Sequence, residues 1–234
     1  MTKYFVLGSD KLETATTPSG GGGAVPMLTP VTPVLADLTE DYPSVGMISA
    51  QDGSTIAISL SENIIWWHHN FTKALPAYSQ WKARLGFTFM PGSVPDAVYP
   101  AIMGLDYPNF GLCLGDSASP DMHWVGLTVA AAGSYSLGWG SYFHFSRWTG
   151  ATTKNSTTDF GSGRLCPLTH HWIQFYYDGS YWVYFQISIN GLDWITQMKW
   201  HPDFTITKYG FMCMTYGNSS QQVRVFHLDC INVP

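Results

Sequence analysis

HHWIQFYYDGSYWVYFQISINGLDW, residues 170–194, is the stretch of sequence that decides the fold. It alternates apolar and polar residues with a period of two, the pattern of a strand with one buried face. The alternation breaks at Asp178-Gly179 and again at Asn190-Gly191. Both pairs are typical of two-residue hairpin turns, because their glycine readily takes a positive φ angle. The stretch therefore predicts three antiparallel strands in a meander.

The middle strand of this meander has two different faces, because successive side chains of a strand point to opposite sides. One face is apolar and is expected in the core, namely Val183, Phe185, Ile187 and Ile189. The other face places large aromatic rings beside polar groups, namely Trp182, Tyr184, Gln186 and Ser188. A face of this second kind suits either another packed layer or a binding surface.

Charge and hydropathy argue against two classes of partner. The formal net charge is −5 and the 11 lysines and arginines are scattered, so we expect no nucleic-acid partner. No apolar run approaches the ~18 residues that cross a bilayer, so we expect no membrane insertion. The start, MTKYFVLGSDK, turns polar too early for a signal peptide. We therefore expect synthesis in a cytoplasm without export.

The composition indicates a surface built from uncharged polar side chains. Only 12% of the residues are charged while 45% are hydrophobic, and that charged fraction is about half the usual one. Such surfaces are common in β-sandwiches, in glycan-binding proteins and in subunits of larger assemblies. The cysteines lack metal-site spacing, and without a secretion signal we expect buried free thiols at Cys113, Cys166, Cys213 and Cys230.

Residues 1–45 differ in kind from the rest of the chain. They contain the glycine run 20–23 and several prolines, which disfavour helices and regular ladders. Apolar residues are nevertheless frequent, namely Tyr4, Phe5, Val6, Leu7, Val25, Met27, Leu28, Val31, Val34 and Leu35. A disordered leader is one interpretation. We favour the other, an extended arm that orders by lying on a neighbouring subunit.

Residues 46–234 are expected to form one all-β domain, because no stretch keeps a helical period over three turns. Turn signals recur at short intervals, as in sandwiches and barrels. The expected strands lie within residues 54–60, 64–71, 82–90, 99–105, 110–114, 122–130, 139–148, 172–199, 204–215 and 222–233.

The order of features in residues 60–234, about three quarters of the chain, resembles the concanavalin A-like, laminin-G-like jelly-roll superfamily. The resemblance rests on the Trp-led strand 172–175, the Tyr-Asp-Gly-Ser hairpin 177–180 and the Ser-x-Asn-Gly-x-x-Trp turn 188–194, with Gly210-Phe211 and Leu228-Asp229 near the end. It implies a two-sheet antiparallel β-sandwich. Such folds bind glycans, bind proteins, hydrolyse polysaccharides or build larger particles, so the fold alone does not decide the function.

Hydrolysis is not expected. Glucanases of this fold resemble one another in carrying Glu-x-Asp-x-x-Glu, because retaining hydrolysis needs two carboxyl groups about 5 Å apart. The only glutamates here are Glu13, Glu40 and Glu62, in the arm or at the start of the domain. Gly115-Asp116-Ser117 is similar to a serine esterase motif, but the α/β sheet and the Asp-x-x-His of that family are missing.

Metal binding is also not expected, although two arrangements deserve naming. Asp116 and Asp121 flank a short loop and are the best pair for calcium, which some lectins of this fold use. The adjacent histidine pairs point to opposite faces of their strands. A site across strands would have to combine His68, His123, His144 or His171.

The aromatic residues are the remaining indication of function. Most of the tryptophans are expected to pack between the sheets, but a few should stay exposed. Trp182, Tyr184 and Gln186, with Asn190 and Asp193 at the next turn, form the most coherent candidate site. It suits a sugar, or a neighbouring subunit, since aromatic residues are enriched at subunit interfaces too.

These expectations combine in a non-enzymatic bacteriophage virion protein displayed on the particle surface. It would be a tail appendage, a receptor-binding subunit or a capsid decoration, without a cofactor, and a homo-oligomer. Residues 1–45 would anchor it to other virion proteins, chiefly through Tyr4, Phe5, Val6, Leu7, Met27 and Leu28, while residues 46–234 would be displayed and could bind host surface glycans. The alternative is a free-standing lectin-like module of cellular origin.

Overall fold

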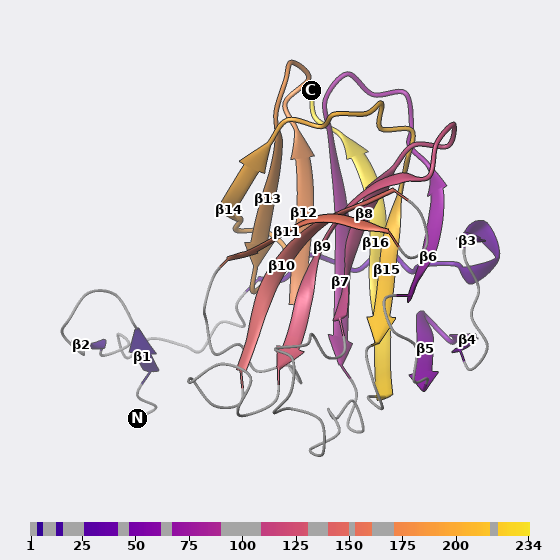
Figure 1. Ribbon diagram of the computed structural model, residues 1–234. Helices are drawn as coiled ribbons and strands as arrows, with labels where there is room; N and C mark the ends of the chain where they lie inside the picture. The colour runs from indigo at the N-terminus through magenta and orange to yellow at the C-terminus, as the bar shows by residue number, and fades with distance from the viewer. Residues whose placement is uncertain are drawn as a thin grey trace.

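In the computed structural model, two antiparallel sheets lie face to face, each with seven strands (Figure 1). The structure describes residues 4–6, 13–15, 26–41, 47–61, 67–89, 109–130, 140–149, 153–160, 171–215 and 220–234. This architecture confirms the predicted all-β sandwich. Among the described residues, no helix is long and apolar enough to cross a membrane.

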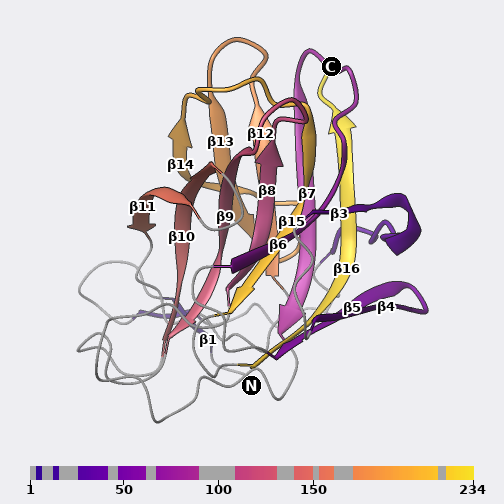
Figure 2. The same ribbon diagram turned by 45° about the vertical axis from the view of Figure 1, so that its right-hand side comes forward.

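The first sheet contains the meander and is called the meander sheet. Its strands follow the order β14 (Ile195–Trp200), β13 (Val183–Ser188), β12 (His171–Tyr177), β7 (Trp81–Phe89), β16 (Ser220–Asn232), β5 (Thr55–Ser61) and β4 (Met47–Asp52). Figure 2 shows β5 and β4 continuing the sheet beyond the C-terminal strand β16.

The second sheet is called the opposite sheet. Its order is β11 (Lys154–Phe160), β10 (Gly140–Thr149), β9 (Asp121–Ala130), β8 (Asn109–Gly115), β15 (Lys208–Thr215), β6 (Trp67–Ala74) and β3 (Thr39–Asp41). A separate two-stranded sheet joins β1 (Tyr4–Val6) and β2 (Glu13–Ala15), and one short 3-10 helix spans Leu35–Asp37. The expected strand at 99–105 lies outside the described residues.

The predicted meander is confirmed, but its turns are longer than two residues. Strand pairing ends at Tyr177 and Val183, so residues 178–182 form the first loop. The glycines take the expected conformation, with φ of 81° at Gly179 and 74° at Gly191. Gly191 also allows a close approach, since a Cβ there would lie 2.8 Å from Leu28 Cβ and 3.0 Å from the Trp172 ring.

The core lies between the sheets and confirms most of the predicted core face. Val183 and Phe185 are fully buried, and Ile187 packs against the core at its rim. Ile189 was predicted on the same face, but it is 84% exposed. The reason is that β13 ends at Ser188, so the alternation of faces does not extend to Ile189.

A segment that crosses the outer side of the meander sheet, residues 26–34, is called the strap (Figure 1). The Leu28 N–H donates to the Asn190 carbonyl over 2.8 Å, and the Val31 N–H donates to His227 Nδ1 over 2.8 Å. The Leu228 N–H in turn donates to the Val31 carbonyl over 3.4 Å. These bonds tie the strap to its own sandwich.

The strap changes the interpretation of the predicted arm. Met27 and Leu28 were expected to contact a neighbouring subunit, yet Leu28 packs on this chain and Met27 beside it is exposed. Beyond the strap, β3 pairs with β6 at the edge of the opposite sheet. The described residues 26–41 therefore lie on the sandwich, although the prediction counted them in the arm. Of its other contacts, Tyr4, Phe5 and Val6 form β1, and Leu7 lies outside the described residues.

Cys113, Cys213 and Cys230 are free thiols, and Cys166 lies outside the described residues. Burial raises the pKa of the Cys213 and Cys230 thiols to about 12 and that of Cys113 further still. These thiols are therefore protonated and unreactive at neutral pH.

Candidate binding surface

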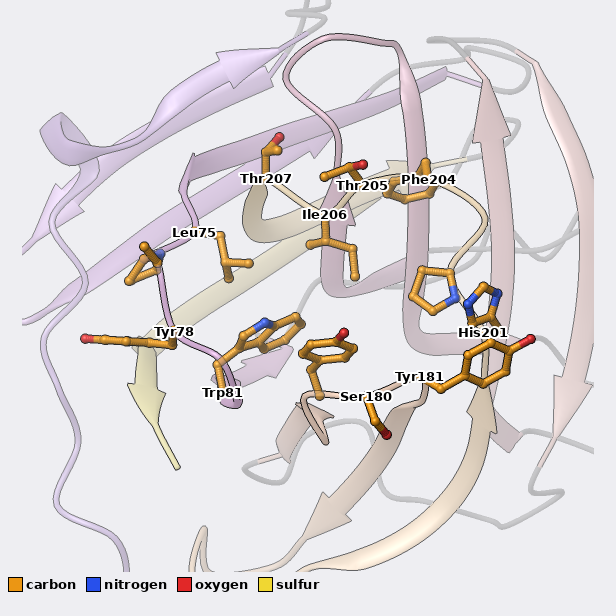
Figure 3. Close-up of a pocket in the computed structure, with 14 residues that line it drawn as sticks. Leu75, Tyr78, Trp81, Ser180, Tyr181, His201, Phe204, Thr205, Ile206 and Thr207 are labelled. Atoms are coloured by element: carbon orange, nitrogen blue, oxygen red, sulfur yellow. The ribbon is translucent and has the colours of Figure 1, made fainter. Parts of the chain in front are cut away.

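A groove opens at one end of the sandwich, between the loops that follow β6, β12 and β14, and is called the end groove (Figure 3). It encloses about 470 Å³. Tyr78 lies toward one end and Tyr181 with His201 toward the other, while Trp81 and Ile206 lie between them. The groove thus brings together segments that are more than a hundred residues apart in the sequence.

The lining of the end groove combines aromatic rings with hydroxyl groups. Trp81 stacks on Tyr177 with ring centroids 5.6 Å apart, and Tyr181 stacks on His201 at 3.8 Å. Tyr78 and Tyr181 keep 39% and 51% of their surface exposed. None of the lining residues carries a carboxylate, an ammonium or a guanidinium group. Such a lining suits a ligand that offers apolar faces together with hydroxyl groups.

Asp178 fixes the loop that carries Tyr181. Its Oδ1 accepts hydrogen bonds from the backbone N–H groups of Ser180, Tyr181 and Trp182, at 3.0 to 3.1 Å. Burial would raise the pKa of Asp178, but these N–H donors outweigh it and lower the pKa to about 2. The carboxylate is therefore ionised at neutral pH, and its hydrogen bonds hold the loop in place.

A row of four side chains crosses the outer side of the meander sheet beside the end groove. We call it the cation–tyrosine row, and it consists of Lys199, Tyr184, Tyr176 and Lys82, each directly opposite the next on adjacent strands. Tyr176 and Tyr184 stack with centroids 5.6 Å apart, and Lys82 Nζ lies 5.5 Å from the centre of the Tyr176 ring. Lys199 Nζ lies 4.6 Å from the centre of the Trp182 ring.

The lysines of this row are held only weakly. A cation over an aromatic ring at an exposed site gains about 0.5–1 kcal/mol, whereas a hydrogen bond to a charged group contributes about 1.5–3 kcal/mol. A ligand anion can therefore draw either ammonium group away from its ring.

The predicted site residues do not all lie together. Trp182, Tyr184 and Gln186 line the outer side of the meander sheet. Gln186 is engaged with its neighbours, since it accepts from Gln174 Nε2 and donates to Thr196 Oγ1 over 2.8 Å.

Asn190 and Asp193 lie in the loop at the other end of β13, where Asn190 is buried. Asn190 Oδ1 accepts from the N–H groups of Leu192 and Asp193 at 3.0 Å, and its Nδ2 donates to Asp193 Oδ2 over 2.9 Å. These two residues therefore shape a turn, and a ligand at Trp182 would not reach them.

The predicted candidates for metal binding are engaged in other contacts. Asp116 Oδ1 accepts from the Ala118 N–H over 2.9 Å, and Asp121 Oδ2 accepts from Ser119 Oγ over 2.9 Å. His123 Nδ1 accepts a hydrogen bond from Trp200 Nε1, and the His171 ring packs on Phe87. Within the described ranges, no group of three or more His, Cys, Asp and Glu residues could hold a metal ion. The side chains of His68 and His144 lie outside what the structure describes.

Comparison with known proteins shows the fold. No protein-family model matches the sequence, and no curated protein matches it significantly. A functionally unknown protein from Saccharomyces cerevisiae has a similar structure, with a TM-score of 0.58 and 11% identity over 86% of this chain and 98% of that chain. A legume lectin-like domain from Entamoeba histolytica gives 0.51 and 11%, over 85% and 91%.

A third similar structure is the exoplasmic/lumenal domain of VIP36, solved with Ca²⁺ and Man3GlcNAc bound. Its TM-score is 0.50 at 8% identity, covering 85% of this chain and 84% of that chain. At such identities the likeness concerns the fold. The fold of this chain is thus a two-sheet β-sandwich similar to that of these lectin-like structures, as the sequence resemblance predicted.

Proposed function

We propose that this chain is a non-enzymatic, glycan-binding protein whose end groove receives a sugar. The observation that carries the proposal is the lining of that groove, in which half-exposed tyrosines flank a floor of stacked aromatic rings and hydroxyl groups. Sugar rings have apolar C–H faces and polar rims, so they pair with aromatic rings and hydroxyl groups together. The lectin-like fold supports the same class of ligand.

The lining also supports a binding role without catalysis. General acid–base hydrolysis of a glycosidic bond needs two carboxyl groups at the sugar. The end groove has none among its lining residues. The nearest carboxylate along the chain, Asp178, is committed to three backbone N–H groups.

We expect single Tyr78→Ala and Tyr181→Ala variants to bind glycan at least tenfold more weakly, because each loses an aromatic wall of the groove, worth about 1.4 kcal/mol. The measurement is a glycan array followed by titration calorimetry on the best hit. Ile189→Ala is the matched control, since Ile189 is exposed at the far end of β13. Failure of the unaltered protein to bind any glycan class would contradict the proposal.

The setting that we propose is the surface of a bacteriophage particle, as a tail appendage or a capsid decoration. The support is the sequence of residues 1–25, with its glycine run and apolar start, which precedes the strap. In this setting the protein is made in the host cytoplasm, is anchored by this segment and displays the sandwich as a homo-oligomer. A free-standing lectin-like module of cellular origin is the alternative, and the fold supports it equally.

Deletion of residues 1–25 separates the two settings. The strap and β3 lie after this segment and remain in the shortened protein, so we expect its unfolding midpoint to stay within about 2 °C of that of the full chain. We expect it to be absent from purified particles, while the full chain co-sediments with them. Equal incorporation of both forms would overturn the anchoring role, and no incorporation of either would favour the cellular module.

A further inference from the structure

The lysines and arginines of the two sheets are unevenly paired with carboxylates. In the described part of the chain, Arg84, Arg147, Lys208 and Arg224 each contact a carboxylate, namely Asp229, Asp203, Asp41 and Asp52. Lys82 and Lys199, like Lys73 of the opposite sheet, have no carboxylate within ion-pair distance among the described residues and lie over aromatic rings. Lys82 and Lys199 both belong to the cation–tyrosine row, which therefore carries two unneutralised positive charges.

From this arrangement we propose that the glycan is acidic, with a carboxylate or phosphate group that Lys199 and Lys82 bind. The inference rests on the proposed glycan binding and names the class of ligand. The row spans adjacent strands β14, β13, β12 and β7, and directly opposite residues are about 5 Å apart. Its two lysines are therefore about 15 Å apart along the sheet, so the row accommodates an oligosaccharide with more than one acidic group.

The rings of the row favour polar contacts over stacking. Tyr176 and Tyr184 are stacked on each other, and Lys82 lies over the Tyr176 ring. Trp182 is covered by Lys199 and meets the edge of Tyr181 at 5.0 Å. The row thus presents ammonium groups and phenol edges, which are donors for sugar hydroxyls and acidic groups.

The row is continuous with the end groove. Tyr181 lines the groove and contacts Trp182, and Lys199 lies over Trp182. An oligosaccharide that extends from the groove past Tyr181 would therefore bring its next unit near Lys199. Two carboxylates lie close to the row, and neither forms an ion pair with its lysines. Asp178 is saturated by N–H donors and by the Tyr184 hydroxyl at 3.4 Å, and Asp229 is paired with Arg84.

The test uses ligand pairs that differ only in charge. Oligogalacturonate is compared with its methyl ester, and a mannose 6-phosphate oligosaccharide is compared with its unphosphorylated parent. Titration calorimetry is run on the full chain at low and high salt. We expect the acidic member to bind at least tenfold more tightly, with an advantage that shrinks as salt rises, because salt screens exposed charges.

Substitutions of its two lysines test whether the cation–tyrosine row causes the preference for the acidic ligand. Lys199→Gln should weaken binding of the acidic member about tenfold, and Lys199→Gln with Lys82→Gln should abolish the preference for it. Lys73→Gln is the matched control and should change nothing. Lys73 also lies over a tyrosine ring, with its Nζ 5.4 Å from the centre of Tyr209, but belongs to β6 of the opposite sheet.

The outcomes are distinguishable. Equal affinity for both members of each pair, insensitive to the lysine substitutions but lost in Tyr181→Ala, would overturn the acidic preference and leave glycan binding intact. Binding of inorganic polyphosphate as tight as that of oligogalacturonate, and unaffected by Tyr181→Ala, would also overturn it, because the row would then attract any polyanion. Absence of binding to every probe would overturn both proposals.

Discussion

Asp229→Asn should lower the free energy of unfolding by about 3–5 kcal/mol, because it leaves a buried guanidinium group without its counter-charge. Asp229 Oδ1 accepts from Arg84 Nε over 2.8 Å, and Oδ2 accepts from Arg84 Nη2. The two side chains are only 13% and 12% exposed. His227 Nε2 also lies 3.2 Å from Oδ1, outside the angular range of a hydrogen bond. Asparagine keeps the shape of this carboxylate but removes its charge.

Urea denaturation of the variant at neutral pH measures this loss. The informative control is Asp229→Leu combined with Arg84→Met, which removes both charges and should recover most of the stability. Recovery would show that the unpaired charge, and not a change in packing, causes the loss. A loss below about 1 kcal/mol in Asp229→Asn would mean that the pair behaves like an exposed salt bridge.

Acidification should destabilise the protein by about 3 kcal/mol between pH 6.5 and pH 4 through His123 alone. Burial disfavours the charged imidazolium and lowers the pKa of His123 from 6.5 to about 4, although the nearby Asp203 carboxylate opposes it. The contacts of His123 are consistent with a neutral ring. Its Nδ1 accepts a hydrogen bond from Trp200 Nε1 over 2.9 Å, and its Nε2 lies 3.3 Å from Asp203 Oδ1. Only the neutral ring can accept at Nδ1.

The direction of this pH effect follows from the number of protons that His123 binds in the folded and the unfolded state. Between the two pKa values the unfolded chain binds a proton at His123 and the folded chain does not, so acidification favours unfolding. The stability that the neutral ring supplies is complete above about pH 6.5 and is lost as the pH falls to about 4. His123→Leu should be less stable at pH 7 and should lack this component. Parallel stability profiles of the two proteins across this range would contradict the assignment.

The strongly alternating segments allowed the sandwich to be predicted. In β12, β13 and β7 the buried side is apolar and the other side is mixed. Both the two-residue period of the strand and its buried face can therefore be recognised in the sequence. β4 and β11 were missed, because MISAQD and KNSTTDF carry too few apolar residues to reveal a face. Both lie at sheet edges, where one side is open and the requirement for burial is weakest.

The candidate site was predicted only in part. Tyr184 and Gln186 share a face because they alternate along β13, and Trp182 at the end of the preceding loop continues the alternation, so this part of the pattern is local. The end groove joins the loops after β6, β12 and β14, and sequence proximity gives no sign of it. Asn190 and Asp193, also predicted at the site, bond within their own turn, since polar residues at a turn serve the backbone as readily as a ligand.

The strap has a mechanical consequence for any protein that is tethered through its N-terminal segment. Tension applied at residue 26 is transmitted first to the hydrogen bond of Leu28 with Asn190, and then to those of Val31 with His227 and Leu228. These bonds lie across the sheet and precede β3, so they would yield one after another before any strand of the sandwich was loaded. If the protein is held through this segment, as proposed, breaking the hydrogen bonds of the strap would absorb extension before the strands that carry the end groove were loaded.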